Sequence, residues 1–385
     1  MDPDALREAL DRWTDEGLID DATAARIAES DPDAEGLLGE SRIVVALALM
    51  GGVLVAAGVT ALLIERWGSI PVAARAAVLV VVPLFAAAGG ASLERTSPRT
   101  AHGLWLLAAL FTGVTLFQLA ELATPVDRDV VEPWLVGAWT VASIAVAARI
   151  DSRPIGGLAS VLGAATAVTA TASENPVLLV GFYGSVAYTA GLLAGGGIGG
   201  RLPGGGTAAS SIPRFARTLR WTGGAFAVVA VVPLVATGAR WGDPTGPGIA
   251  LLAVATAVAA AVAFRRVGGD RPAGYAVVPA VVGPLSLAAA WAALGLMESL
   301  AGALAALGCL LVSVLALVVG AVGLREASLA NAATLGFVLG VAAFLVGPVA
   351  DAISGSIALV VAGLILLAAG LGAERGRRAV LARIG

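Results

Sequence analysis

Residues 301–350 read AGALAALGCLLVSVLALVVGAVGLREASLANAATLGFVLGVAAFLVGPVA, a stretch with two apolar runs of membrane length. About 20 residues rising 1.5 Å each cross a hydrocarbon core of about 30 Å. Residues 301–323 and 329–350 are therefore each predicted to span a bilayer, with Arg325 in the short break between them. Long apolar runs separated by short polar breaks also make up most of the rest of the chain.

The composition of the whole chain agrees with a membrane protein. Of its 385 residues, 58% are hydrophobic and 13% are charged, whereas soluble domains usually carry about 25% charged residues. Since so few charges cannot cover a surface in water, we predict an all-α fold, a polytopic transmembrane bundle of about 12 helices. The predicted spans are residues 43–64, 76–93, 102–120, 132–148, 154–172, 176–194, 219–238, 247–264, 275–296, 301–323, 329–350 and 352–373.

The placement of arginine predicts the orientation of these spans. The chain has no lysine, and with the N-terminus inside, 20 of its 24 arginines lie in cytoplasmic segments. Such a bias is what the positive-inside rule requires, so we predict a multi-pass protein of the cell membrane with both termini in the cytoplasm. Removing one span would invert all later loops, so residues 154–172 and 176–194 must both cross or neither.

The N-terminal segment differs from the rest of the chain, because 13 of the 27 acidic residues lie within its first 40 positions. We predict an acidic cytoplasmic helical hairpin at residues 1–41, with Gly17 ending its first helix and Asp20 or Asp21 beginning its second. It is expected to bind the ends of the membrane helices or a cytoplasmic protein partner. Its composition is halophile-like, and an ordinary acidic tail from a GC-rich genome is the alternative that remains open.

The remaining residues divide into two membrane halves. Residues 42–194 are predicted to form a first six-helix half, residues 195–213 a glycine-rich cytoplasmic linker, and residues 214–385 a second six-helix half. Whether the two halves are a repeat stays open. Prolines within the spans free backbone carbonyls, which either line a cavity or bind neighbouring helices. These prolines are Pro83, Pro233, Pro279, Pro284 and Pro348.

The chain contains no signature of an enzyme. It has no phosphate-binding loop, no cluster of metal ligands and no arrangement of a nucleophile with histidine. Cys309 and His102 are the only residues of their kinds, and we interpret them as a buried small side chain and an interfacial residue. We therefore expect no catalytic residue, cofactor or metal site, and no nucleic acid partner, because basic residues flank the membrane spans only.

One group of polar residues is a candidate site at the predicted outer ends of the helices. Ionisable groups at membrane depth are costly and often functional, but water reaches these boundaries. A shared ligand or proton site and a set of separate interfacial anchors are both open interpretations. The candidate residues are Glu65, Arg66, Arg75, Gln118, Glu121 and Asp351.

Several motifs near the N-terminus resemble a known family. They are Leu10-Asp11-Arg12-Trp13, Gly17-Leu18-Ile19, Gly51-Gly52, Glu65-Arg66-Trp67-Gly68-Ser69-Ile70-Pro71, and Phe117-Gln118-Leu119-Ala120-Glu121-Leu122. Together they resemble the predicted membrane proteins called domain of unknown function 2157, mainly over the first 150 residues. The resemblance implies a multi-pass bundle with a small cytoplasmic head, and it implies no activity. Arg66 departs from the Asn that relatives often carry before this Trp.

Two functions fit these observations. The first is a non-catalytic scaffold or assembly component whose acidic head binds a partner. The second is a small-solute transporter built from two six-helix halves. A polar cavity near mid-membrane between the halves would favour the transporter, and a tightly packed centre would favour the scaffold.

Overall fold

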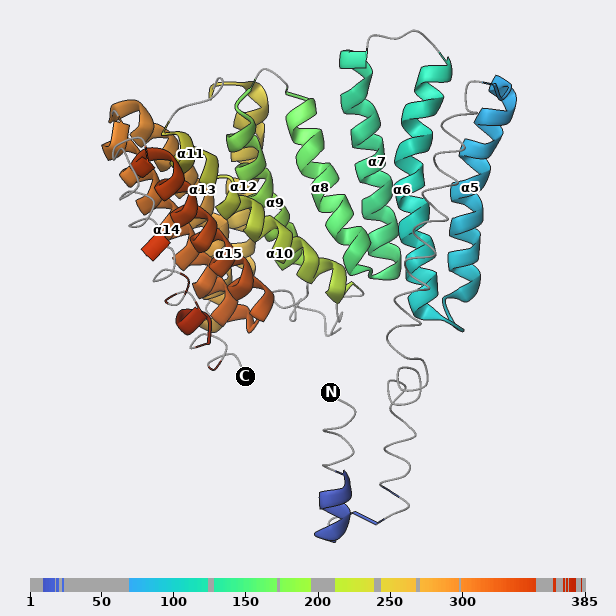
Figure 1. The fold of residues 1–385 in the computed structure, drawn as a ribbon, viewed down its shortest axis with the longest axis horizontal. Coiled ribbons are helices and arrows are strands. Elements are labelled where there is room, and N and C mark those ends of the chain that lie inside the picture. The colour runs from blue at the N-terminus through green and yellow to red at the C-terminus, as the bar shows by residue number, and fades with distance from the viewer. Residues whose placement is uncertain are drawn as a thin grey trace. The chain divides into compact units, whose positions relative to one another are not determined.

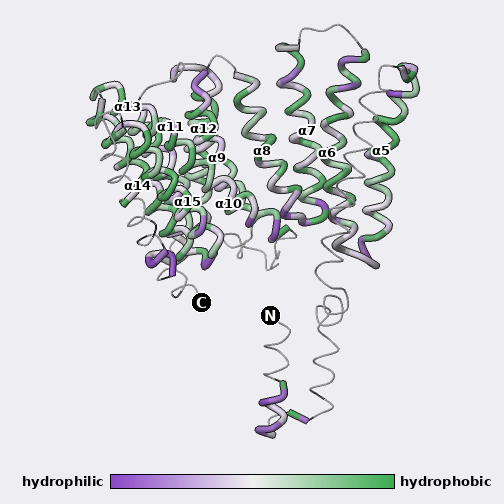
Figure 2. The backbone as a smooth tube through the Cα atoms, viewed as in Figure 1, coloured by the Kyte–Doolittle hydropathy of each residue, from purple (hydrophilic) through white to green (hydrophobic). Residues whose placement is uncertain are grey.

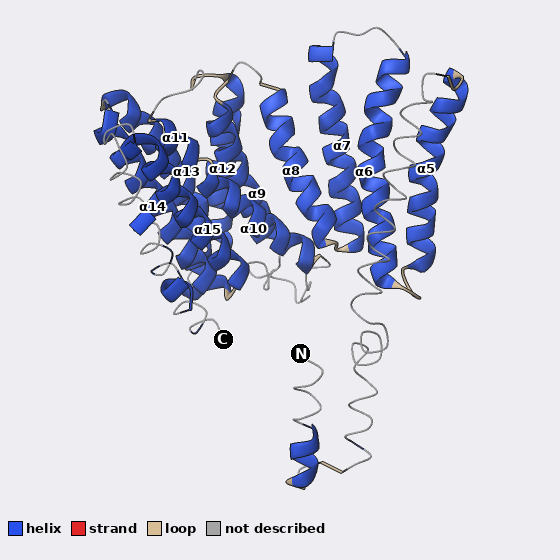
Figure 3. Cartoon of the chain, in the orientation of Figure 1, coloured by secondary structure: helices blue, strands red, loops and turns tan. Residues whose placement is uncertain are grey.

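The structure is a computed structural model that describes most of the membrane region. The described residues are 10–17, 19–20, 23, 69–123, 128–171, 174–194, 212–238, 244–267, 271–297, 299–350, 363–364, 370, 372, 374–378 and 382. These residues form helices joined by turns and contain no β-strand (Figure 3). The chain divides into two units, residues 1–75 and 76–385, and each is described by itself.

Figure 1 shows the helices of the described ranges. They are α5 (Val72–Leu93), α6 (Pro98–Ala123), α7 (Arg128–Ile150), α8 (Arg153–Thr169), α9 (Pro176–Ala194), α10 (Pro213–Val229), α11 (Val232–Thr237), α12 (Pro247–Val267), α13 (Arg271–Leu296), α14 (Ser299–Leu324), α15 (Ala327–Phe344) and the π-helix η1 (Leu345–Val349).

The predicted fold class, an all-α membrane bundle, is confirmed. Within the described residues, nine helical segments are long and apolar enough to cross a membrane, counting α10 with α11 and α15 with η1. The tenth, α8, has 17 residues and rises about 25 Å. Several helices begin a few residues before the predicted spans, and α10 begins at Pro213, six residues before the predicted span 219–238. The predicted span 43–64 and most of 352–373 lie outside the described residues.

In the first unit, the described part of the acidic segment includes a helical stretch before Gly17. Residues 10–15 are helical, and Gly17 has a positive φ of 69°, the conformation that commonly ends a helix at glycine. Asp20 Oδ1 accepts a hydrogen bond from the Thr23 N–H at 2.9 Å, as an N-cap does. Hydrogen bonds from the side chain and the backbone of Thr23 lower the pKa of Asp20. Most of the predicted hairpin lies outside the described residues, so the hairpin stays a prediction.

In the second unit, α9 lies at the centre of the best packed region. It packs against α8, α10, α12 and α13, while α13 packs along α14 and α14 along α15. Fully buried side chains such as Tyr188, Leu287 and Leu310 fill the space between these helices. Since no water is available in a bilayer to drive association, this close packing is a main source of the stability of the bundle.

Glycines allow α9 and α10 to touch through their backbones. A Cβ on Gly184 would lie 2.7 Å from the Ala227 nitrogen and from the Gly223 carbonyl oxygen. A Cβ on Gly223 would overlap the Tyr188 nitrogen. Small residues at such positions are typical of membrane helix pairs, and the glycine at each position is required by the close approach of the two backbones.

Helices α6, α7 and α8 pack in sequence, and α8 also contacts α9 and α10. The Trp139 indole of α7 donates from Nε1 to the Ala109 carbonyl of α6 at 2.7 Å, and it occupies the space that a side chain at Gly113 would fill. Ile155 of α8 and Phe215 of α10 belong to one buried apolar cluster. This cluster links α8 to the start of α10.

The carbonyls near two of the membrane prolines are bound by neighbouring helices. Pro83 lacks an N–H, which leaves the Leu79 carbonyl without its helical donor, and Thr115 Oγ1 of α6 donates to that carbonyl at 2.6 Å. One turn before Pro279, the Ala276 carbonyl accepts from the Tyr188 hydroxyl at 2.8 Å. At Pro83 the freed carbonyl therefore joins α5 to α6.

Apolar side chains cover the outer sides of the membrane helices in the described ranges. Figure 2 shows apolar residues along the helices of the second unit and polar residues near several helix ends. Large exposed side chains include Phe85, Trp134, Leu251 and Leu285, each at least 64% exposed. Because the spans are predicted to lie in lipid, these exposed apolar faces are the ones expected to contact acyl chains.

Candidate functional site

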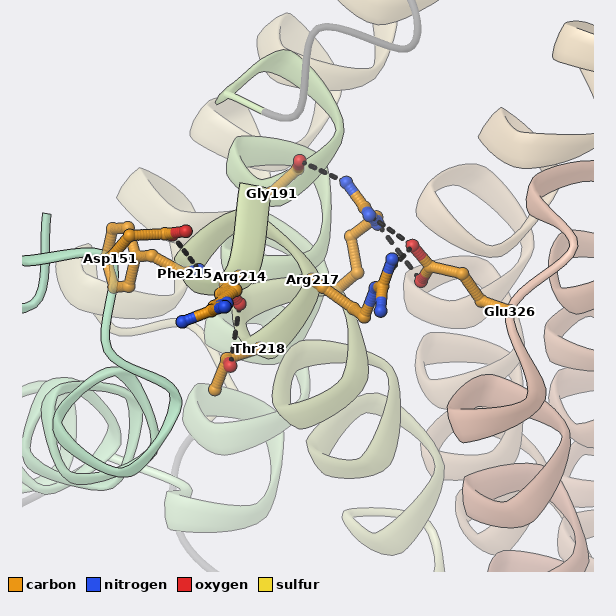
Figure 4. Close-up of polar contacts among 8 residues, drawn as sticks. Asp151, Gly191, Arg214, Phe215, Arg217, Thr218 and Glu326 are labelled. Carbon is orange, nitrogen blue, oxygen red and sulfur yellow. Dashed lines mark hydrogen bonds and ion pairs between the residues drawn. The ribbon is translucent and has the colours of Figure 1, made fainter. Parts of the chain in front are cut away.

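The site is built around the first three turns of α10, where the sequence places three arginines at helical spacing. Pro213 occupies the first turn, where its missing N–H costs nothing. Asp151, which follows α7, accepts from the Phe215 N–H at 2.8 Å and so caps the exposed end of α10 (Figure 4). Asp151 has a φ of 49°, a left-handed conformation that aspartate tolerates better than most residues.

Arg220 is the central cation of the site, and it is only 8% exposed. Its Nε donates to Glu326 Oε2 at 3.2 Å, its Nη2 forms a second, shorter bond to Glu326 Oε1, and its Nη1 donates to the Gly191 carbonyl at 2.9 Å. Bidentate pairing of this kind is the strongest geometry for arginine and a carboxylate. A Cβ on Gly191 would lie 2.8 Å from Arg220 Cγ, so glycine at this position makes room for the arginine.

Glu326 comes from the tight turn between α14 and α15. Arg325 in this turn has a φ of 53°, and Glu326 follows in an extended conformation at the N-cap position of α15. The Glu326 side chain does not cap α15, and it points instead toward α10, where Arg217 Nε lies 3.7 Å from Oε1 (Figure 4). Arg217 is half exposed, so most of the pairing energy falls to Arg220.

The Gly191 carbonyl belongs to the last turn of α9, which carries the negative end of the helix dipole. Carbonyls in that turn lack a helical donor, and Arg220 supplies one. The two arginines and one carboxylate carry a net charge of +1, which the helix end partly balances. The site therefore joins the end of α9, the start of α10 and the turn between α14 and α15.

Several contacts place the arginine-bearing ends of the helices on one face of the second unit. Glu94, after α5, accepts hydrogen bonds from Arg149 Nη1 at 2.8 Å and from Trp105 Nε1 at 3.1 Å. The Arg149 guanidinium also lies 5.3 Å from the centre of the Trp105 ring, a cation–π contact. The bond from Arg149 holds the pKa of Glu94 below its usual range. Because Asp151 and Glu326 both contact α10, their turns lie on this arginine-bearing face too.

On the opposite face, a second buried carboxylate caps another helix. Glu174 is 7% exposed and accepts from the backbone N–H groups of Gly248 at 2.8 Å and Ile249 at 2.7 Å, in the first turn of α12. A negative charge at a helix N-terminus is favourable. The next residue, Asn175, caps α9 through bonds from two backbone N–H groups, those of residues 177 and 178, to its Oδ1. Both ends of α9 are thus fixed to neighbouring helices.

Part of the chain matches a protein-family model. Residues 11–156 match the family model described as predicted membrane protein (DUF2157). The matched region includes α5 to α7 and ends just after the start of α8, so it excludes Arg220, Glu326 and Glu174. No curated protein and no solved structure matches the chain. With its nine membrane-length helices among the described residues, the chain is a multi-pass membrane protein. The match over residues 11–156 confirms the resemblance.

The outer site predicted from the sequence is not tested as a whole. Glu65, Arg66 and Asp351 lie outside the described residues. Arg75, in the first unit, donates from Nε to the Ile70 carbonyl at 2.7 Å. Gln118 and Glu121 lie one turn apart on α6, with Gln118 Nε2 donating to Glu121 Oε2 at 3.2 Å in an exposed position. A shared outer site and separate anchors therefore both stay hypotheses.

The residues of the observed site were missed by the sequence analysis. Arg220 counted only toward the orientation of the chain, and Glu326 was not considered. Two local signals could have indicated the caps. Asn175 stands directly before Pro176, the usual order of an N-cap and the first helical residue, and Asp151 stands in the short break between two apolar runs. The pairing of Arg220 with Glu326 has no local signal, because 106 residues separate them along the chain.

Proposed function

We propose that the chain is a non-catalytic scaffold or assembly component of the cell membrane, with both termini in the cytoplasm. Its acidic N-terminal segment, residues 1–41, would recruit a cytoplasmic protein. The gathering of arginine-bearing helix ends on one face supports this orientation, since basic residues favour the cytoplasmic side.

The observation that carries the scaffold role is the packing at the centre of the second unit. The cavity between α9, α10, α13 and α14 is lined by residues including Ser185, Tyr188, Gly283 and Ser313, and has a volume of about 10 Å³. That volume is about the size needed for one water molecule. Because Ser185 belongs to the first predicted half and Ser313 to the second, this cavity occupies the position where a carrier would hold its solute. The cavity has no room for a solute.

The surrounding polar groups support the same role. Ser313 and Ser286 bind each other, Thr222 of α10 donates to Ser160 of α8 at 2.9 Å, and Tyr188 is bound to the Ala276 carbonyl. Each of these three contacts joins one helix to another. Polar groups that bind a transported solute would instead have to face an open site.

Thiol accessibility tests the proposal against the transporter. In a Cys309→Ala background, Ser185→Cys and Ser313→Cys are treated with a membrane-impermeant thiol reagent from each side, with Arg325→Cys, an exposed position, as the control. We expect the control to react and both buried cysteines to remain unmodified. Reaction of either buried cysteine at a rate similar to the control would refute the scaffold and favour alternating access.

A second experiment tests recruitment by the acidic segment. Deleting residues 1–38 is expected to leave the protein in the membrane fraction, because Arg42 and the first predicted span remain. A protein that cross-links to the full-length chain in cells should be lost from the deletion variant. An unchanged set of cross-linked proteins would contradict the proposed role of this segment.

A further inference from the structure

A groove on the arginine-bearing face lies between α14, α15 and the C-terminal helical residues 374–378. Its volume is about 290 Å³. Val314 and Val318 of α14 form one wall and Ala333 and Phe337 of α15 another, with Gly372, Gly376 and Arg377 completing the lining. The one hydroxyl in this lining, that of Thr334, is bound to the Ala330 carbonyl at 2.9 Å. The groove is therefore apolar along its length.

The glycines of this groove differ from those that bring helices together. A Cβ on Gly336 or Gly340 would overlap or crowd side chains of neighbouring helices, whereas a Cβ on Gly372 or Gly376 would meet nothing within 4 Å. The absence of side chains at Gly372 and Gly376 thus leaves open space beside the groove and is not required by helix packing.

The polar end of the groove is positively charged. Arg377 donates from Nε and Nη2 to Glu374 at 2.8 and 3.0 Å, and from Nη1 to Asn331 Oδ1 at 3.4 Å. Arg378 binds the same carboxylate through Nε at 2.7 Å and is 76% exposed. With exposed Arg375, the segment carries three arginines and one glutamate, a net charge of +2.

We propose that this groove binds an anionic phospholipid, with one acyl chain along Val314, Val318 and Phe337 and the phosphate at Arg377 and Arg378. An apolar slot within the depth of the membrane excludes a polar solute, which would lose its hydration without gaining hydrogen bonds. A basic group at the cytoplasmic end of an interhelical slot matches a lipid that carries a negative headgroup. Arg378 holds Glu374 through Nε alone, and its two Nη groups have no partner among the described residues.

Native mass spectrometry of the full-length protein in detergent tests this site, with added phosphatidylglycerol and phosphatidylcholine of identical acyl chains. The wild-type protein should retain more phosphatidylglycerol than phosphatidylcholine. Each arginine near the headgroup contributes about fivefold to affinity, so Arg377→Gln with Arg378→Gln should weaken retention by about 25-fold. Gly376→Leu should abolish retention while keeping every charge, because its side chain would fill open space in the groove.

Matched controls separate this site from general effects. Arg95→Gln with Arg214→Gln removes two exposed arginines from the same face, and Gly274→Leu adds a side chain to an open position on α13. Both controls should bind phosphatidylglycerol as the wild type does. Equal retention of the two lipids, or undiminished binding by the Gly376→Leu variant, would overturn the proposal. So would a protein dimer that forms in place of the lipid adduct and is lost in Gly376→Leu, since a second copy would then occupy the groove.

Discussion

The buried pair of Arg220 and Glu326 gives the sharpest test of how the second unit is held together. Glu326→Gln keeps the shape of the side chain and one acceptor oxygen, but leaves the Arg220 cation buried with only the Gly191 carbonyl and a neutral amide. Removing one partner of a buried ion pair typically costs about 3–5 kcal/mol. We expect the free energy of unfolding to fall by that amount.

The neighbouring arginine provides a control on the same carboxylate. Arg217 is 50% exposed and lies 3.7 Å from Glu326 Oε1. Exposed pairs contribute about 0–1 kcal/mol, so Arg217→Gln should change stability by less than about 1 kcal/mol. Comparing the stabilities of Glu326→Gln and Arg217→Gln separates the effect of burial from the effect of removing a charge.

A double-mutant cycle compares the single variants Arg220→Met and Glu326→Leu with the variant that carries both. Arg220→Met with Glu326→Leu removes both charges and leaves the Gly191 carbonyl without its donor, which costs about 1–3 kcal/mol. Because the single variants each leave a buried charge and the double does not, the cycle should show a coupling energy of at least about 2 kcal/mol.

Unfolding in mixed micelles, with increasing SDS and detection by far-ultraviolet circular dichroism, measures these differences. For this reasoning to hold, Glu326→Gln must lower the free energy of unfolding clearly more than Arg217→Gln does. Equal, small losses in both variants would mean that Glu326 does not act as a buried counter-ion, and the account of the site would fail.

Four further predictions follow from individual contacts. Gly223→Leu should separate α9 from α10 and prevent stable folding, whereas Gly157→Leu, with nothing within 4 Å, should be tolerated, as size-exclusion chromatography would show. Glu174→Ala should cost about 2 kcal/mol of stability by uncapping α12, and Glu121→Ala, at an exposed position, should cost far less in the same unfolding assay. In a Cys309→Ala background, an impermeant thiol reagent added outside should label cysteine at position 129 or 243 and spare position 204; the reverse pattern would refute the predicted orientation. Arg377 and Arg378 hold the pKa of Glu374 at about 2, below its usual 4.5, so its pairing is intact above pH 4.5 and is lost as the pH falls toward 2, which amide hydrogen exchange of residues 374–378 should detect.

The membrane helices were predictable because hydropathy is a local property. Each apolar run must satisfy its own backbone in lipid, so its length alone indicates a helix across the bilayer. The predicted span begins six residues after the start of α10 for the same reason, because Arg214, Arg217 and Arg220 lower the hydropathy of residues that are nevertheless helical. The distant carboxylate of Glu326 and the Gly191 carbonyl explain why Arg220 is tolerated inside that helix.

Helix caps whose partners are close in the sequence can be predicted from it, and caps with distant partners cannot. Asn175 before Pro176 is a local pattern, and its bonds reach only two and three residues ahead. Glu174 reaches 75 residues ahead to α12, and Asp151 reaches 64 residues ahead to α10. Such partners depend on which helices become neighbours, which hydropathy and arginine placement do not specify.

The position of α9 bears on whether the two predicted halves can move against each other. Although α9 precedes the predicted linker, its backbone touches α10 at Gly184, its last turn is bound by Arg220, and its first residues adjoin the Glu174 cap of α12. A rocking motion between residues 42–194 and 214–385 would have to break these contacts together. Breaking the Arg220–Gly191 bond alone would leave a buried carbonyl without its donor, at a cost of about 1–3 kcal/mol. A carrier would need a solute whose binding offsets that cost, yet the central cavity holds about 10 Å³. These contacts of α9 are the structural support for the proposed scaffold over the alternative of two moving halves.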